Sequence, residues 1–225
     1  MFDKTFLKFF SALAKNNNRE WFTAHKDEYR ELVVAPLSVF ITEMAPRLRK
    51  ISPQFVADPK PNGGSMFRIY RDVRFSRDKS PYKLHAACQF RHRIARDVHA
   101  PGFYVHIAAQ EVIFGGGIWM PPNPVLNRIR DFIVHNPQEW QRIKTDRNMI
   151  KLCGGIGGDS LVRPPRGVDA GHEHISDLKR KSFFVMRHDK PAIIYRDDFA
   201  DEVEKTFKAA KPLMKYLCFA LDIPF

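Results

Sequence analysis

The sequence predicts an α+β fold: a single domain in which helices from both ends of the chain pack around an antiparallel sheet of about four to six strands. Two patterns predict it. Apolar residues recur at helical spacing over residues 1–51 and again after residue 124, whereas residues 66–119 hold short apolar segments in close succession. The 225 residues contain no repeat and no long linker, so 1–225 is expected to form one domain, with a boundary near residue 122 as the alternative.

The first 51 residues predict three helices. The first places on one face the apolar residues Phe2, Phe6, Phe9, Phe10 and Leu13. The second follows capping residues at 16–18 and directs Trp21 and Phe22 toward the core. The third starts at Pro36, which suits a first helical turn, and Pro46 is expected to kink or shorten it.

The middle of the chain predicts four strands after a polar loop at 52–65. They are the segments 66–70, 84–90, 102–110 and 111–119. The last two follow one another with almost no room for a loop, and this favours an antiparallel meander over residues 66–119.

Helices return over residues 124–225, together with one further strand. An apolar stripe over 125–133 predicts one helix, and Asn136 before Pro137 predicts the start of the next. The remaining elements, in chain order, are a break at 153–171, a short helix at 175–181, a strand at 182–188 and a final helix capped by Asp197 or Asp198 and bent at Pro212.

Composition limits the function classes. The formal net charge of +12 attracts phosphates, nucleic acids or acidic surfaces. Cys88, Cys153 and Cys218 are far apart and form no C-x-x-C pair, which argues against a zinc ribbon or a disulfide framework and predicts free buried thiols.

The N-terminal segment fits an amphipathic helix better than a signal peptide, and no apolar stretch reaches the length of a membrane span. We expect a cytoplasmic protein outside the membrane, and we assign it no metal and no cofactor.

The segment FRIYRDVRFSRDKSPYK, residues 67–83, concentrates charge among apolar residues. In a strand, alternation would set Arg71 between Ile69 and Val73, where a guanidinium needs a carboxylate or a ligand anion as its partner. The two acids, Asp72 and Asp78, cannot neutralise the six cations, which are Arg68, Arg71, Arg74, Arg77, Lys79 and Lys83. The excess positive charge predicts that this segment binds an anion.

Three functions are compatible with this segment. The first is a pocket for a phosphate-bearing or other anionic small molecule, built from Arg68, Arg71, Arg74, Lys79 and Lys83. As an enzyme it would process phosphate esters or nucleotides, with Asp72 or Glu20 as the general base. Gly116, Tyr82 and Trp119 are candidate ligand contacts. The alternatives are a non-enzymatic nucleic-acid-binding protein that uses the same cations, and a structural or partner-binding protein whose arginines are paired internally.

The other motifs carry no catalytic signal. GGGIW at 115–119 lacks the Gly-Lys-Ser/Thr of a phosphate-binding loop, and His172-Glu173-His174 lacks the spacing of a zinc helix. The histidines at 85, 92, 99 and 106 are seven residues apart, a spacing that alternates faces in a strand and indicates coincidence.

Five segments together resemble a known family over nearly the whole chain, from the first helix to residue 185. They are NNNREWF…HK…Y (16–29), FRIYRDVRFSRDKSPYK (67–83), GFYVHI (102–107), GGGIW (115–119) and LKRKSFFV (178–185). The family is the domain of unknown function 2461 family of conserved hypothetical proteins, and the arginine segment is its most distinctive motif. The resemblance implies a stand-alone, soluble, single-domain protein, and it transfers no activity and no catalytic residue.

Overall fold

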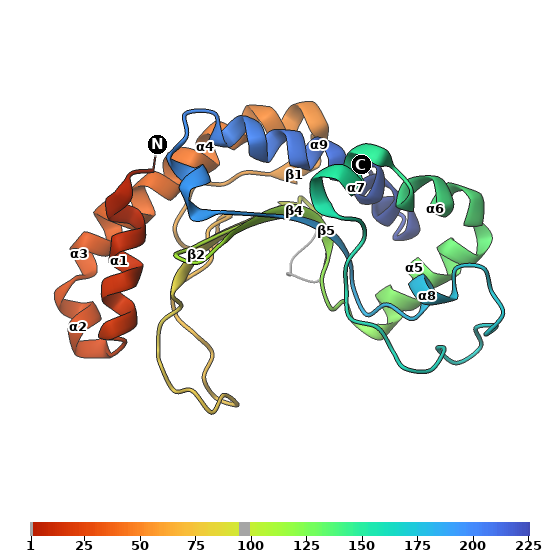
Figure 1. Ribbon diagram of the computed structural model, residues 1–225, viewed down its shortest axis with the longest axis horizontal. Helices are drawn as coiled ribbons and strands as arrows, with labels where there is room; N and C mark the ends of the chain where they lie inside the picture. The colour runs from red at the N-terminus through yellow and green to blue at the C-terminus, as the bar shows by residue number, and fades with distance from the viewer. Residues whose placement is uncertain (1, 95–99) are drawn as a thin grey trace.

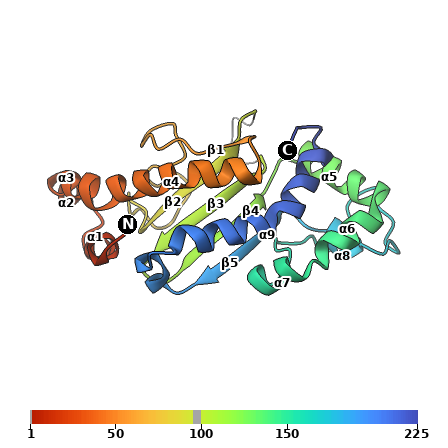
Figure 2. The ribbon, with the colours of Figure 1, turned by 90° about the horizontal axis from the view of Figure 1, so that it is seen from above.

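Two long helices, α4 (Ala35–Ile51) and α9 (Phe199–Ala220), lie across one face of an antiparallel sheet (Figures 1 and 2). The structure is a computed structural model that describes residues 2–94 and 100–225. Arg47 of α4 bonds to Glu204 of α9 at 2.7 Å and also pairs with Asp201, so the two helices are joined by charge as well as by packing.

The sheet has five strands in the order β1-β2-β3-β4-β5, and each neighbouring pair is antiparallel. The strand order follows the chain order, so the predicted α+β fold and the antiparallel meander are confirmed. The strands are β1 (Phe55–Val56), β2 (His85–His92), β3 (Gly102–Ala108), β4 (Val112–Ile118) and β5 (Phe183–Asp189).

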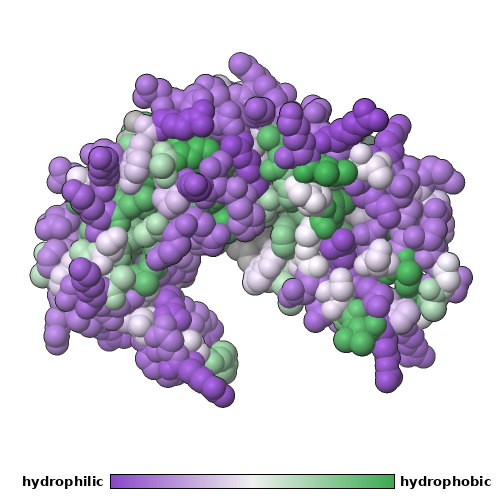
Figure 3. All heavy atoms as spheres, viewed as in Figure 1, coloured by the Kyte–Doolittle hydropathy of each residue, from purple (hydrophilic) through white to green (hydrophobic). Residues whose placement is uncertain are grey.

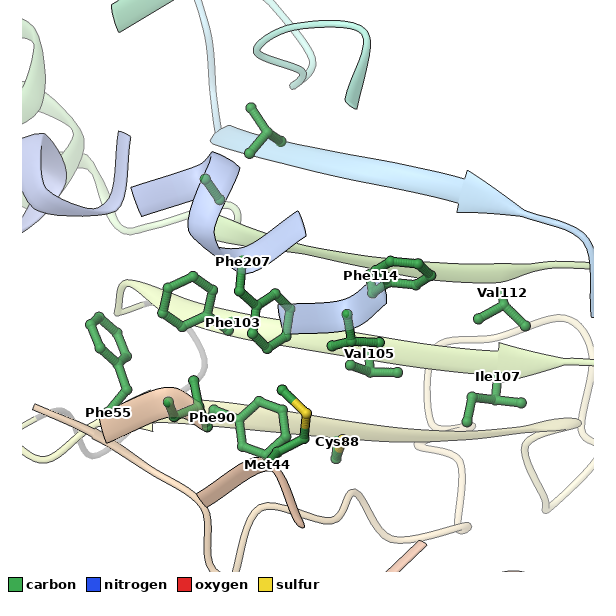
Figure 4. Packing of buried hydrophobic residues seen from close by; sticks show 14 of the residues in the cluster. Met44, Phe55, Cys88, Phe90, Phe103, Val105, Ile107, Val112, Phe114 and Phe207 are labelled. Atoms are coloured by element: carbon green, nitrogen blue, oxygen red, sulfur yellow. The ribbon is translucent and has the colours of Figure 1, made fainter. Parts of the chain in front are cut away.

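The core lies between this sheet and the two long helices (Figure 4). Side-chain alternation directs Cys88 and Phe90 of β2 toward the helices, together with Phe103 of β3 and Phe114 of β4. Phe207 of α9 stacks on Phe103 with ring centroids 4.6 Å apart. Buried apolar residues from Phe2 to Ala220 form one continuous cluster, so the described chain folds as a single domain.

Two strand predictions were wrong. The segment 66–70 is not a strand and makes only the isolated bridges Met66–Cys88 and Tyr70–Tyr82. Pro81 lies opposite this segment and has no N–H to donate, so a regular ladder cannot continue. In contrast, the short strand β1 lies inside the expected polar loop, where Phe55 and Val56 pair with the end of β2.

The N-terminal helices form largely as predicted. They are α1 (Lys4–Lys15), α2 (Arg19–Ala24) and α3 (Lys26–Tyr29), followed by a π-helical turn (Arg30–Val34) that runs directly into α4. Pro36 lies in the first turn of α4, as predicted, and α4 continues through Pro46 to Ile51 instead of ending there. Phe22 is buried, as predicted, whereas Trp21 is only partly buried and stacks on His25 at 4.0 Å.

The segment between β4 and β5 forms a helical group at the other end of the molecule (Figure 1). Asp146 accepts a hydrogen bond from the Met149 N–H and starts a separate helix that was not predicted from the sequence. After β5, a 3-10 helix (Pro191–Tyr195) leads into α9, which continues through Pro212. The helices of the group are α5 (Asn123–His135), α6 (Pro137–Lys144), α7 (Arg147–Cys153) and α8 (Ile175–Leu178).

The three thiols are free, with Cys88 and Cys218 buried and Cys153 partly buried. Burial raises the pKa of Cys153 to about 11 and that of Cys218 to about 12, so both are protonated and unreactive at neutral pH. Over residues 2–94 and 100–225, no helix combines the length and the apolar character needed to cross a bilayer.

Candidate functional site

The arginine segment forms an irregular hairpin, residues 67–83, here named the arginine hairpin. Its base joins the outer edge of β2, where the Phe67 N–H donates to the Ala87 carbonyl at 2.9 Å. The Lys83 N–H donates to the Ile69 carbonyl at 2.8 Å and closes the two arms. The tip projects from the sheet on the side away from α4 and α9 (Figure 1).

Two of the arginines are held by the hairpin's own acids. Arg74 Nη2 donates to Asp72 Oδ2 at 2.7 Å. Arg71 bonds to Asp78 at 2.5 Å and donates to the Ser80 carbonyl at 3.1 Å. The Arg71 side chain is 27% exposed, so it is partly desolvated and paired, as predicted, and its partner is a protein carboxylate.

The structure lends no support to a catalytic base on the hairpin. Hydrogen bonds from Arg74 lower the pKa of Asp72 to about 2, and a carboxylate that weakly basic accepts a proton poorly at neutral pH. Asp72 is exposed to solvent, and its carboxylate is already paired with Arg74. Glu20 is exposed in the first turn of α2, and its role as a base stays a prediction.

The remaining hairpin cations have no carboxylate partner among the described residues. Lys79 Nζ donates to the Val73 carbonyl at 3.0 Å, and Lys83 Nζ donates to the Arg68 carbonyl at 2.8 Å. Arg68 and Arg77 make no side-chain hydrogen bond or ion pair within residues 2–94 and 100–225. The internal pairs therefore leave part of the hairpin's positive charge uncompensated.

A cavity of about 370 Å³, here named the Arg68 cavity, separates the base of the hairpin from α2, α3 and the π-helical turn. Its lining contains the cations Lys26, Arg30 and Arg68 and no carboxylate. Arg30 bonds to Asp27 outside the lining at 2.8 Å. Burial, with a further contribution from Tyr70, raises the pKa of Tyr29 in the cavity wall to about 12, so this phenol stays protonated.

The sheet face opposite α4 and α9, here named the open face, carries a second cluster of polar rings. His85 of β2 and His106 of β3 lie with ring centroids 4.2 Å apart, and Tyr104 Oη is 3.3 Å from His106 Nδ1. Burial lowers the pKa of His85 to about 4, helped by His106 and Lys83, and burial also lowers the pKa of His106. Both imidazoles are therefore neutral at pH 7.

The seven-residue spacing of these histidines was interpreted from the sequence as a coincidence without functional meaning. The antiparallel register sets His106 opposite Ala87, and this brings it beside His85 on the same face. His92 instead points to the core side, where its Nε2 contacts the Pro224 carbonyl at 2.7 Å, and His99 lies outside the described residues. The alternation of Tyr104 and His106 with Phe103, Val105 and Ile107 was the sequence signal that could have placed His106 on the face opposite the core.

The three candidate ligand contacts occupy different environments. Tyr82 is buried and stacks on Phe22 with ring centroids 4.1 Å apart. A Cβ at Gly116 would lie 2.8 Å from Phe103 Cδ1 and 3.0 Å from Met214 Sδ, so this glycine allows α9 to pack against β4. Trp119, directly after β4, is 61% exposed and accessible to a ligand. The structure thus brings Arg68 to a cavity and does not gather the five predicted cations in one pocket.

Comparisons with known proteins identify the family of the chain and give no activity, substrate or partner. Neither the comparison with curated proteins nor that with solved structures gave a match. Among the described residues, no group of three or more His, Cys, Asp or Glu side chains is placed to hold a metal ion. The model of the family described as conserved hypothetical protein (DUF2461) matches residues 5–216, and the chain therefore belongs to this family.

Proposed function

We propose that the protein binds a small phosphate-bearing anion in the Arg68 cavity. The observation that carries this proposal is the composition of the lining, which holds three cations and no carboxylate. Arg68 has no side-chain partner among the described residues, so its guanidinium is available for a bidentate contact with a phosphate. The volume of about 370 Å³ lies within the range of small-molecule sites.

The walls fit a ligand with an apolar portion beside its phosphate. Phe67 and Tyr70 line the cavity near Arg68, and Phe22 adds a buried ring. Lys26 offers a second, flexible cation. Among the described lining residues there is no histidine or carboxylate to act as a base, so the geometry supports binding more strongly than hydrolysis.

Thermal melts with inorganic phosphate, pyrophosphate and a nucleoside monophosphate test this proposal. We expect at least one of these anions to raise the melting temperature by about 2–4 °C at saturating concentration. Arg68→Ala should remove this stabilisation, and Arg68→Lys should weaken it because a lysine cannot make the bidentate contact.

Arg77→Ala is the matched control, because Arg77 is a second arginine of the hairpin without a side-chain partner among the described residues and it does not line the cavity. It removes the same charge and should preserve the stabilisation. Equal loss in the Arg68 and Arg77 variants would indicate attraction by net charge alone. No stabilisation of the wild type by any of the three anions would refute the site.

A further inference from the structure

We propose that the open face of the sheet binds single-stranded nucleic acid. This inference goes beyond the small-anion site and, apart from Phe67, which also lines the Arg68 cavity, rests on different residues. Among the described elements, α4 and α9 cover one face of the sheet and no helix packs against the other. Figure 3 shows the molecule hollowed on that side, between the arginine hairpin and the helical group α5–α8.

Stacking surfaces line this face beside the hairpin. Phe67 and Tyr104 lie with ring centroids 6.0 Å apart, and the His106 and His85 rings continue the row. All four side chains are partly exposed. Planar rings on an exposed surface are what unpaired bases stack on, and the neutral imidazoles add hydrogen-bonding edges without a charge that would need a fixed counterion.

Short neighbours leave these rings accessible. The register sets Tyr104 opposite Gln89 and Gly115, and it sets His106 opposite Ala87 and Ile113. Gly115 beside Tyr104 and Ala87 beside His106 raise no long side chain, so each ring has one open side. A flexible strand of bases can therefore approach the sheet closely at this place.

One buried polar atom on this face lacks a partner. Gln89 is 8% exposed, and its buried Oε1 has no hydrogen-bond partner among the described residues. Cys88 and Phe90 point toward the helices, so alternation directs Gln89 to the open face. A buried acceptor without a partner is costly, and an N–H of a base edge would satisfy it.

Positive charge borders the same face. Lys83 Nζ lies 5.5 Å from the Phe67 ring centroid, and Arg91 occupies the open-face register at the other end of β2. The arginine hairpin, whose tip projects on this side of the sheet (Figure 1), contains the exposed cations Arg77 and Lys79. Cations that border a row of rings match the phosphates and bases of a single strand, whereas a duplex keeps its base faces stacked inside.

Fluorescence anisotropy with labelled oligomers of about 12 nucleotides at about 150 mM salt tests this inference. The probes are oligo-dT, oligo-U, a duplex of equal length and an abasic oligomer with the same number of phosphates. We expect both single strands to bind, and the duplex and abasic oligomer to bind at least about tenfold more weakly. Phe67→Leu and Tyr104→Leu should each weaken single-strand binding about tenfold without changing the charge.

Phe219→Leu is the matched control, because Phe219 is an exposed ring on α9, which packs on the other face of the sheet. It should change affinity by less than about twofold. Circular dichroism checks that each variant is folded, and Lys83→Gln provides a variant that does not alter a ring and should lower the slope of affinity against salt.

Equal affinity for the abasic oligomer, or wild-type affinity in both ring variants, would overturn the inference and leave only non-specific attraction. The outcome is separable from the small-anion proposal, because Arg68→Ala should abolish phosphate stabilisation while single-strand affinity changes by less than about threefold.

Discussion

His85 shows how the surroundings of one side chain make stability depend on pH. Its pKa is about 4 in the folded protein, below the usual 6.5, because burial, His106 and Lys83 all disfavour the imidazolium. The unfolded chain therefore takes up the proton first as the pH falls. The contribution of the neutral His85 side chain to the free energy of unfolding is fully present above about pH 6.5 and is lost progressively as the pH falls toward 4.

Urea unfolding at pH 7.5 and at pH 4.5 measures this contribution. We expect His85→Gln to lose about 1–2 kcal/mol less stability than the wild type between these two values, after allowance for partial solvent screening. His135→Gln, which alters an exposed histidine of α5, should follow the wild type. Parallel pH profiles of wild type and His85→Gln would contradict the assignment.

Arg71 shows that the sequence can predict that a residue is paired, whereas the contribution of the pair to stability depends on its exposure in the structure. Charge balance and apolar neighbours correctly predicted that Arg71 is paired. The strand assumed for it would have buried the pair, and loss of a buried partner is costly. In the hairpin the Asp78 side chain is 60% exposed, so water can solvate this carboxylate if Arg71 is removed. The pair therefore contributes far less than a buried one would.

At the scale of elements, Asp177 at the end of α8 fixes the helical group. Its carboxylate accepts hydrogen bonds from Trp140 Nε1 at 3.0 Å, Lys144 Nζ at 3.1 Å and Arg180 Nε at 3.0 Å. The Asp177 side chain is 6% exposed. Hydrogen bonds from these donors outweigh desolvation and lower its pKa, so it stays ionised.

Removing this carboxylate should loosen the contact between α6 and α8. We expect Asp177→Ala to lower the free energy of unfolding by about 3–5 kcal/mol, because Lys144 and the buried Trp140 N–H lose their acceptor. Denaturant unfolding measures the loss. The control is Asp131→Ala on α5, an exposed acid, which should change stability by less than about 0.5 kcal/mol. A loss below 1 kcal/mol in Asp177→Ala would mean that water replaces the carboxylate.

The elements that sequence predicts well are those with strong local patterns. Four of the five strands and most helices follow from apolar periodicity. β1 has only two residues and depends on its partner β2, so no local pattern marks it. The histidine pair of the open face likewise arises from strand register. Tyr82 and Gly116 were predicted as ligand contacts and lie in the core, since apolar periodicity does not specify which face a hairpin or strand presents to the core.

At the scale of the whole molecule, the net charge of +12 opposes compaction. Raising sodium chloride from about 20 mM to about 200 mM shortens the range of this repulsion, so we expect the melting temperature to rise by a few degrees. Differential scanning fluorimetry measures the shift, and an uncharged osmolyte at equal osmolarity controls for effects other than screening. A fall in melting temperature with salt would mean that ion pairs such as Arg47–Glu204 outweigh the repulsion.

The position of α9 in the chain affects how the protein is made. β4 and β5 are neighbours in the sheet, yet α5–α8 lie between them in sequence, and α9 follows later still. While a ribosome synthesises the residues from β4 to Phe207, at about 5–20 residues per second, Phe103 and Phe114 lack the helix that covers them. The nascent chain thus exposes for several seconds the apolar part of the sheet that α9 later covers, and a fragment that stops before α9 would present this surface permanently to other chains.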